Sequence, residues 1–322
     1  MKKYIILVIK LIISGSILTF LFYKIPVFEI GKSLGSANFF LIIISFSIYL
    51  LCIFLSAFET SYLTRAQEIF ISTLQILKIH LVTMFYSLFL PGILSGAGVK
   101  WYKFSRYGSK SDAAAVVVFN RFLEILMLLF TGIIFSLPVF MTKEQDRLVT
   151  ILLFFLLAVI ASYFLMLNSN ALTFFERKIL LVPSPAIIKK ITSKFFSSMR
   201  KYQNLTLKDN IQILGLLFLY HSLGITVAYL LTLSLRIDIS FFDIGWIRSV
   251  ITILAMLPIS FAGLGIREGS LVFLLSNYGI QPGDALAYSF LLFFNMVLVA
   301  LSGGFIEFSD FLFRREDIIK EE

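Results

Sequence analysis

The first candidates for a functional site in this chain are charged side chains that lie beside glycine-rich turns. Arg267 and Glu268 directly follow one such turn in an otherwise apolar region. A helix that is broken at a turn exposes backbone N–H groups to an anion, and arginine binds phosphate through paired hydrogen bonds. The pair is therefore our first candidate for a phosphate-binding site. The alternative is that Arg267 and Glu268 pair with each other or with a neighbour and only anchor the turn.

A second group of polar residues lies in the first half of the chain. Lys100 follows a similar glycine-rich segment and is a second candidate for binding the substrate. The alternative is that Lys100 lies in a loop that faces water. Asn120, Arg121 and Glu124 lie early in a long apolar run, with Arg121 and Glu124 three residues apart on one helical face. Ionisable groups are costly in hydrocarbon, so they usually face a bundle interior. The Arg121–Glu124 pair could bind a headgroup, couple a proton or only link helices.

Arg248 is a further candidate, because it lies in a short apolar segment in the second half of the chain. It could contact a substrate, or its long side chain could reach the membrane surface. Metal and nucleotide chemistry are not indicated. The chain has 1 Cys and 2 His, lacks the P-loop pattern, and departs from the dinucleotide fingerprint at Gly263 and Gly265. We expect neither a metal nor a cofactor.

The composition places all of these residues in or beside a lipid bilayer. Of the 322 residues, 59% are hydrophobic and 15% are charged, whereas a soluble domain is about a quarter charged. No polar stretch is long enough to form a separate soluble catalytic domain. The net charge of +9 comes from basic residues clustered between apolar runs. Such clusters indicate topology signals and contacts with anionic lipids rather than nucleic acid.

Apolar runs of about 20 residues, the length that crosses a bilayer as a helix, recur along the chain. We predict six transmembrane helices, at residues 4–23, 38–58, 112–137, 148–167, 211–235 and 286–307. Two further apolar segments, 76–91 and 244–258, are too short to cross. Both end in a Leu-Pro pair that is followed by glycines.

The two short segments form an internal repeat. In each copy the proline is followed by glycine at the fifth and seventh positions and by a cation at the ninth. The turn residues are Pro91, Gly96 and Gly98 in the first copy and Pro258, Gly263 and Gly265 in the second. Proline and glycine break helices, and irregular backbone at membrane depth is tolerated where it lines a cavity. We therefore predict re-entrant helical hairpins at 76–100 and 244–275, with ordinary loops between tilted helices as the alternative.

Basic loops indicate which side of the membrane each segment faces. Loops 96–111 and 168–210 are rich in Lys and Arg, so we place them in the cytoplasm together with both termini. The amphipathic stretch 187–202 within the second loop is an interfacial helix or a solvated loop. This arrangement inverts one half relative to the other, as in transporters built from inverted repeats.

The predicted fold is therefore an all-α polytopic membrane protein of one domain, residues 1–322, with about six transmembrane helices and two re-entrant hairpins in an inverted repeat. Residues 1–140 form the first half. Residues 141–210 hold one span and the basic segment, and residues 211–310 form the remainder of the second half. We expect the protein in the plasma (inner) membrane.

Taken together, these motifs resemble a known family. Leu90-Pro91 with its glycine-rich segment, Asn120-Arg121-x-x-Glu124, and Gly263-Leu264-Gly265-Ile266-Arg267-Glu268-Gly269 are similar to the flippase-like transmembrane domain of bacterial lysylphosphatidylglycerol synthases. The resemblance extends from the first span to the last, although the first motif lacks the family's acidic residue. It implies movement of lipids between leaflets. It does not include the soluble aminoacyl-transferase domain, so we expect no enzymatic activity.

We therefore expect a lipid translocase that moves a phospholipid or another phosphate-bearing lipid. The ligand would be an anionic or lysylated phospholipid, or a polyprenyl-phosphate-linked lipid, and the partner a second copy or a lipid-synthesis enzyme. One alternative is a membrane-embedded transferase with Glu124 or Glu268 as base. Another is a non-catalytic subunit of a lipid-synthesis or glycolipid-synthesis complex. The energy source is open between the lipid's own gradient and a proton carried by Glu124 or a histidine.

Overall fold

The computed structural model describes the backbone of residues 2–89, 93–142, 146–183, 185–256, 260 and 263–321. Side chains 2–11, 13, 93–95, 142, 146–149 and 311–321 lie outside this description. Every regular element in the described residues is a helix, as the all-α prediction requires.

Within the described residues, five helices are long and apolar enough to cross a membrane. They are Phe39–Ala66, Lys110–Met141, Thr150–Leu167, Leu207–Ser234 and Pro282–Asp310. Each coincides with one of the predicted spans. The sixth predicted span, 4–23, lies in helix α1 (Lys2–Lys24), but the side chains of its first part lie outside the described residues. Its crossing of the membrane stays a prediction.

The chain divides into two compact units, which we describe separately. Unit 1 comprises Met1–Cys52, Lys78–Ala97 and Leu223–Glu322, and unit 2 comprises Ile53–Leu77 and Gly98–Ser222. Helices α3 (Phe39–Ala66), α4 (Thr73–Phe89), α5 (Ile93–Phe104) and α10 (Leu207–Ser234) contribute to both. These units do not follow the halves 1–140 and 211–310, and the inverted repeat stays a prediction.

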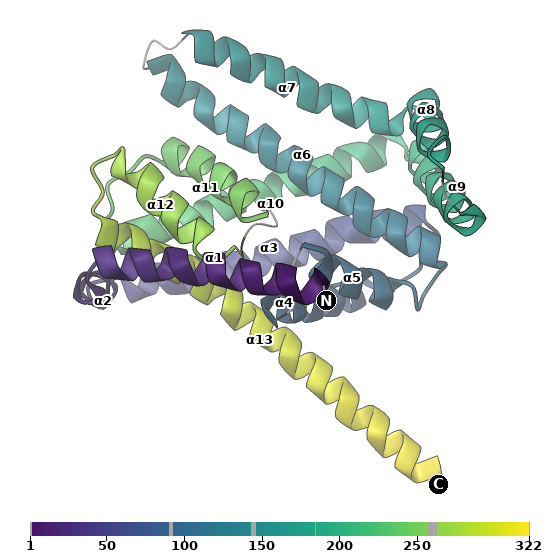
Figure 1. The fold of residues 1–322 in the computed structure, drawn as a ribbon, viewed down its shortest axis with the longest axis horizontal. Coiled ribbons are helices and arrows are strands. Elements are labelled where there is room, and N and C mark those ends of the chain that lie inside the picture. Colours follow the sequence, from purple (N-terminus) through teal and green to yellow (C-terminus); the bar gives the residue numbers. More distant parts are fainter. Residues whose placement is uncertain are drawn as a thin grey trace. The chain divides into compact units, whose positions relative to one another are not determined.

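In unit 1, short helices pack against α13 (Pro282–Glu321) and against each other. Helix α12 (Ile266–Ser276) contacts α1, α11 (Phe241–Met256) and α13, and α2 (Val27–Gly35) packs on α13 (Figure 1). Buried aliphatic side chains such as Ile247, Leu271 and Leu275 form the core between these helices. At the start of α13, Ser33 Oγ donates a hydrogen bond of 2.5 Å to Asp284 Oδ1 and so ties α2 to α13.

In unit 2, α6 (Lys110–Thr142) and α7 (Asp146–Leu167) lie side by side (Figure 1). The basic segment 168–210 is largely helical, with α8 (Ser169–Leu180), α9 (Ala186–Arg200) and the short 3-10 helix η1 (Lys201–Asn204). Helix α9 packs on α6 through buried side chains that include Phe196 and Met199, and it exposes Ile187, Ile188 and Ile191. The predicted amphipathic stretch is thus a helix, and its contact with the membrane surface stays a prediction.

The two predicted hairpins are each built from a pair of short helices. Helices α4 and α11 have 17 and 16 residues, and each is followed by a second short helix, α5 or α12. Both prolines, Pro91 and Pro258, lie outside the described residues. The depth to which these pairs enter the membrane stays a prediction.

The first glycine-rich segment differs from the prediction, because Gly96 and Gly98 lie inside helix α5 and not in a turn. Close packing explains the glycine at 96. A Cβ atom there would lie 2.3 Å from Ser87 Oγ of α4. In the second copy, Gly263 and Gly265 do lie in a turn, with φ angles of 77° and 84°. Such angles are strained for residues other than glycine.

Candidate functional site

The N-terminus of α12 in unit 1 holds the first sequence candidate, the Arg267–Glu268 pair. The backbone N–H of Gly265 donates a hydrogen bond of 2.6 Å to Glu268 Oε2, so Glu268 caps its own helix. Helix α1 passes close to this turn, because a Cβ atom on Gly265 would lie 3.0 Å from Ile17 Cβ. The place that we expected an external anion to take is therefore occupied by the protein's own carboxylate.

Arg267 is engaged within the protein. Its Nε donates to Glu268 Oε1 at 3.0 Å and to Ser289 Oγ at 3.3 Å, and its Nη2 also donates to Glu268. The guanidinium carbon lies 4.8 Å from the centre of the Phe293 ring. The side chains of Arg267 and Glu268 are only 12% and 1% exposed. This geometry is that of a buried ion pair that holds the turn, which was the alternative at the sequence level.

Arg248, on α11 of unit 1, has an unused hydrogen-bond donor. Its Nη1 is buried and has no hydrogen-bond partner among the described residues. Its charge acts on Tyr49, Cys52 and Tyr288, so these side chains lie near it. Gly224 of α10 packs directly against the guanidinium group. Arg248 therefore lies within unit 1 with a buried donor that no described residue satisfies.

Unit 2 contains three polar side chains, from three helices, that are linked by hydrogen bonds. Lys100 Nζ of α5 donates a hydrogen bond of 2.6 Å to Asn120 Oδ1 of α6. Asn120 Nδ2 donates in turn to Glu59 Oε2 of α3 at 3.0 Å. Glu59 and Asn120 are buried, whereas Lys100 is only partly buried. We call these three residues the polar triad.

Arg121 and Glu124 lie next to the polar triad on α6. Arg121 Nη1 donates to Glu124 Oε2 at 3.1 Å, and the two side chains are 41% and 23% exposed. Glu124 acts electrostatically on both Lys100 and Glu59, and Arg121 acts on Lys100. The structure therefore brings the sequence candidates Lys100, Asn120, Arg121 and Glu124 together in one place.

A comparison with protein families identifies the family to which this protein belongs. A family model described as the lysylphosphatidylglycerol synthase TM region matches residues 7–303. The chain belongs to this family. The match includes the polar triad, Arg248 and the Arg267–Glu268 pair, and it agrees with the resemblance seen in the motifs. No curated protein matches the chain.

As a member of the lysylphosphatidylglycerol synthase TM family with five membrane-competent helices, the chain is an integral membrane protein. The family relates it to the modification or translocation of phospholipids. In the part of the chain that the structure describes, His, Cys, Asp and Glu side chains form no group that could hold a metal ion.

Sequence reasoning missed Glu59, which is the buried end of the polar triad. The predicted span 38–58 ends one residue before Glu59. Helix α3 instead continues to Ala66, for 28 residues. The signal that could have identified it is a single acid followed by Thr60, Ser61 and an apolar Tyr62-Leu63, which continues the helix rather than ending it.

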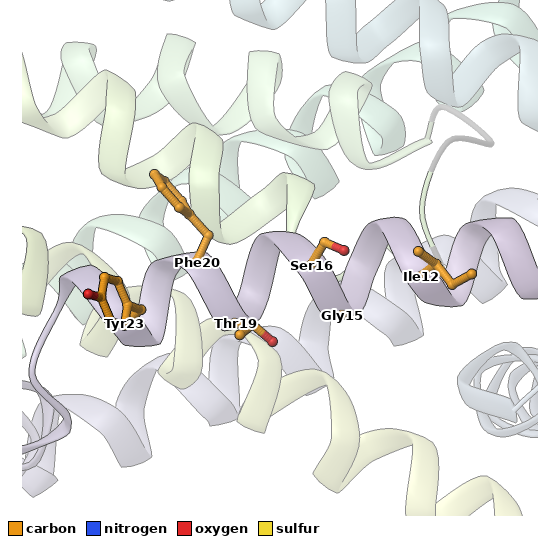
Figure 2. A pocket seen from close by; sticks show the side chains of 6 residues that line it. All are labelled: Ile12, Gly15, Ser16, Thr19, Phe20 and Tyr23. Atoms are coloured by element: carbon orange, nitrogen blue, oxygen red, sulfur yellow. The ribbon is translucent and has the colours of Figure 1, made fainter.

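A shallow groove runs along α1 in unit 1. Figure 2 shows that its lining comes from this single helix. The lining residues are Ile12, Gly15, Ser16, Thr19, Phe20 and Tyr23. None of them is charged, so the groove offers a phosphate group the hydroxyl groups of Ser16, Thr19 and Tyr23 but no cation.

The loop after α12 is tied to the start of α11. Tyr278 Oη donates a hydrogen bond of 2.6 Å to Asp243 Oδ1. Burial, together with this hydrogen bond, raises the pKa of Tyr278 above its ordinary value. The phenol therefore stays protonated and holds the two ends of the α11–α12 pair in place.

Proposed function

We propose that this chain moves a phospholipid or another phosphate-bearing lipid between the two leaflets of the plasma (inner) membrane. The observation that carries the proposal is the polar triad of unit 2, in which Lys100 joins a buried polar interior to a partly exposed surface. Polar groups in the interior of apolar helices are characteristic of substrate pathways through membranes. The family, which concerns a membrane region of a phospholipid-modifying enzyme, supports the same class of substrate.

Lys100 and Arg121 are the residues that would contact the phosphate. Both are partly exposed, and Arg121 lies close enough to act electrostatically on Lys100. Ammonium and guanidinium groups form short, charge-assisted hydrogen bonds with phosphate oxygens. These bonds would replace part of the water that a headgroup loses in the membrane, while the tails stay in lipid. The classes that fit are an anionic or lysylated phospholipid and a polyprenyl-phosphate-linked lipid.

Arg248 is the corresponding cation of unit 1. Its buried Nη1 lacks a partner among the described residues, so an anion could satisfy this donor without breaking an existing hydrogen bond. The Arg267–Glu268 pair has a different role in the proposal. Because Glu268 caps α12 and Arg267 neutralises Glu268, the pair keeps the turn at Gly263 and Gly265 rigid.

Reconstitution of the purified chain in liposomes tests this function. Fluorescent anionic, lysylated and polyprenyl-phosphate lipids are placed in the inner leaflet, and their arrival outside is followed by chemical quenching. We expect transport of at least one of these lipids, with a strong loss in Lys100→Gln and Arg121→Gln. Lys189→Gln, which removes an exposed cation of α9, is the matched control and should transport normally.

Mass spectrometry of the same liposomes separates transport from synthesis. We propose that the chain is not an enzyme, so no new lipid should form. A new lipid product without any movement between leaflets would overturn the proposal in favour of a membrane-embedded transferase.

A further inference from the structure

The buried end of the polar triad is a carboxyl group with one unused oxygen. Glu59 is 1% exposed. Its Oε2 accepts hydrogen bonds from Asn120 Nδ2 at 3.0 Å and from Thr60 Oγ1 at 3.1 Å. Its Oε1 is buried and has no hydrogen-bond partner among the described residues. A buried carboxylate with unused acceptors is costly unless a nearby positive charge compensates it.

Lys100 supplies that compensating charge, but through an amide rather than by direct contact. The Asn120 oxygen accepts from Lys100 and the Asn120 nitrogen donates to Glu59. An ammonium group can only donate, so the amide oxygen of Asn120 faces Lys100 and its amide nitrogen is left to donate to the carboxyl group of Glu59. With Lys100 and Glu59 both charged, the empty triad is neutral overall, with its two charges at opposite ends.

The other groups around Glu59 do not offer a second positive charge. Helix α6 presents Glu124, whose negative charge repels that of Glu59, and η1 presents the phenol of Tyr202. Arg121 is paired with Glu124 and acts on Lys100. Among the described groups that act on Glu59, Lys100 is the cation. Anything that draws the positive charge of Lys100 away leaves Glu59 uncompensated.

An anionic headgroup bound at Lys100 would draw the positive charge of Lys100 away from Glu59. The phosphate would hold the ammonium group at the exposed end of the triad, and the buried carboxylate would then face only Glu124 and neutral groups. We propose that Glu59 takes up a proton from water when an anionic phospholipid binds at Lys100, and releases it when the lipid leaves. The inference rests on the proposed function, and it identifies the coupling ion and the residue that carries it.

Charge balance gives the physical reason for this coupling. The proton forms an O–H bond on the carboxyl group of Glu59 and cancels one unit of negative charge. The loaded triad, with lysine, phosphate and a neutral Glu59, then has the same net charge as the empty one. Without the proton, the loaded triad would hold one uncompensated negative charge in hydrocarbon, where such charges are costly.

Proton uptake on lipid binding tests the inference directly. Short-chain phosphatidylglycerol is added to the purified full chain in weakly buffered detergent solution with a pH indicator, and binding is measured in parallel by calorimetry. We expect uptake that saturates together with binding. Glu59→Gln should bind the lipid and take up no proton. Glu68→Gln, which removes an exposed acid of the same unit, should behave as the original chain.

Three results separate the inference from the proposed function. Lipid binding without proton uptake would overturn the inference and leave lipid transport standing. Proton uptake that persists in Glu59→Gln would also overturn it, because another group would carry the proton. Absence of lipid binding by the original chain would remove the proposed function and the inference together.

A second measurement covers the case in which Glu59→Gln does not fold. Infrared spectra of the original chain should gain the carbonyl band of a protonated carboxylic acid when the lipid is added. In liposomes, an acidic solution on the side where the lipid starts should accelerate its transport. Transport with neither the band nor a pH-gradient dependence would overturn the inference.

Discussion

The guanidinium group of Arg248 packs directly against the α-carbon of Gly224. A Cβ atom on Gly224 would lie 2.4 Å from Nη2 and 2.8 Å from Cζ of Arg248. A glycine within a helix such as α10 destabilises it by about 1 kcal/mol relative to alanine. Here the glycine leaves the space that lets a large cation lie between helices of unit 1.

This packing predicts the effect of Gly224→Ala. The added methyl group should displace the Arg248 side chain, so lipid transport in liposomes should fall markedly although the helix propensity of α10 improves. Gly215→Ala is the matched control, because Gly215 lies in the same helix and a Cβ atom there would have no neighbour within 4 Å. Equal transport by the two variants would show that the position of Arg248 does not matter.

The buried ion pair predicts a large loss of stability in Glu268→Ala. This change leaves Arg267 without its counter-charge and the Gly265 N–H without its acceptor. Removing one partner of a buried pair costs about 3–5 kcal/mol. The thermal unfolding midpoint in detergent should fall accordingly. Glu124→Ala breaks a more exposed pair, which is worth about 0–1 kcal/mol, so a similar fall in both variants would contradict the prediction.

A close approach of α13 to α4 predicts that Gly303→Ala destabilises unit 1. A Cβ atom at 303 would lie 2.0 Å from the backbone oxygen of Leu81, and backbone cannot move aside as a side chain can. Overpacking typically costs about 1–3 kcal/mol. We expect a lower yield of folded protein and a lower unfolding midpoint. Gly15→Ala, where the new Cβ atom meets nothing within 4 Å, should leave both unchanged.

The proposed sidedness predicts the labelling of α9. Cys52, the only cysteine, is buried and can be replaced by alanine to give a cysteine-free chain. Lys189→Cys in that chain places one thiol on an exposed position of the basic segment. A membrane-impermeant maleimide should label it in inside-out vesicles and not in intact cells. Labelling in intact cells would place this segment outside.

Much of the fold could be predicted from the sequence, because the thickness of the bilayer sets how long an apolar stretch must be to cross it as a helix. Five of the predicted spans coincide with long apolar helices, and the amphipathic stretch 187–202 is largely α9. The pairing of Arg121 with Glu124 followed from helical spacing alone. Gly96 was placed in a turn, because its sequence matches that of Gly263, yet it lies in a helix and makes room for Ser87.

The partners of the charged residues were decided only by tertiary structure. The sequence itself determined that the chain lies in a membrane, where its apolar helices run and that Arg267, Lys100 and Arg121 need compensation. It did not determine that Glu268 caps its own helix, or that Glu59 joins Asn120 across 61 positions of chain. Length and hydropathy are local properties, whereas a buried charge is stabilised by whichever group the packing of distant helices brings within hydrogen-bond distance.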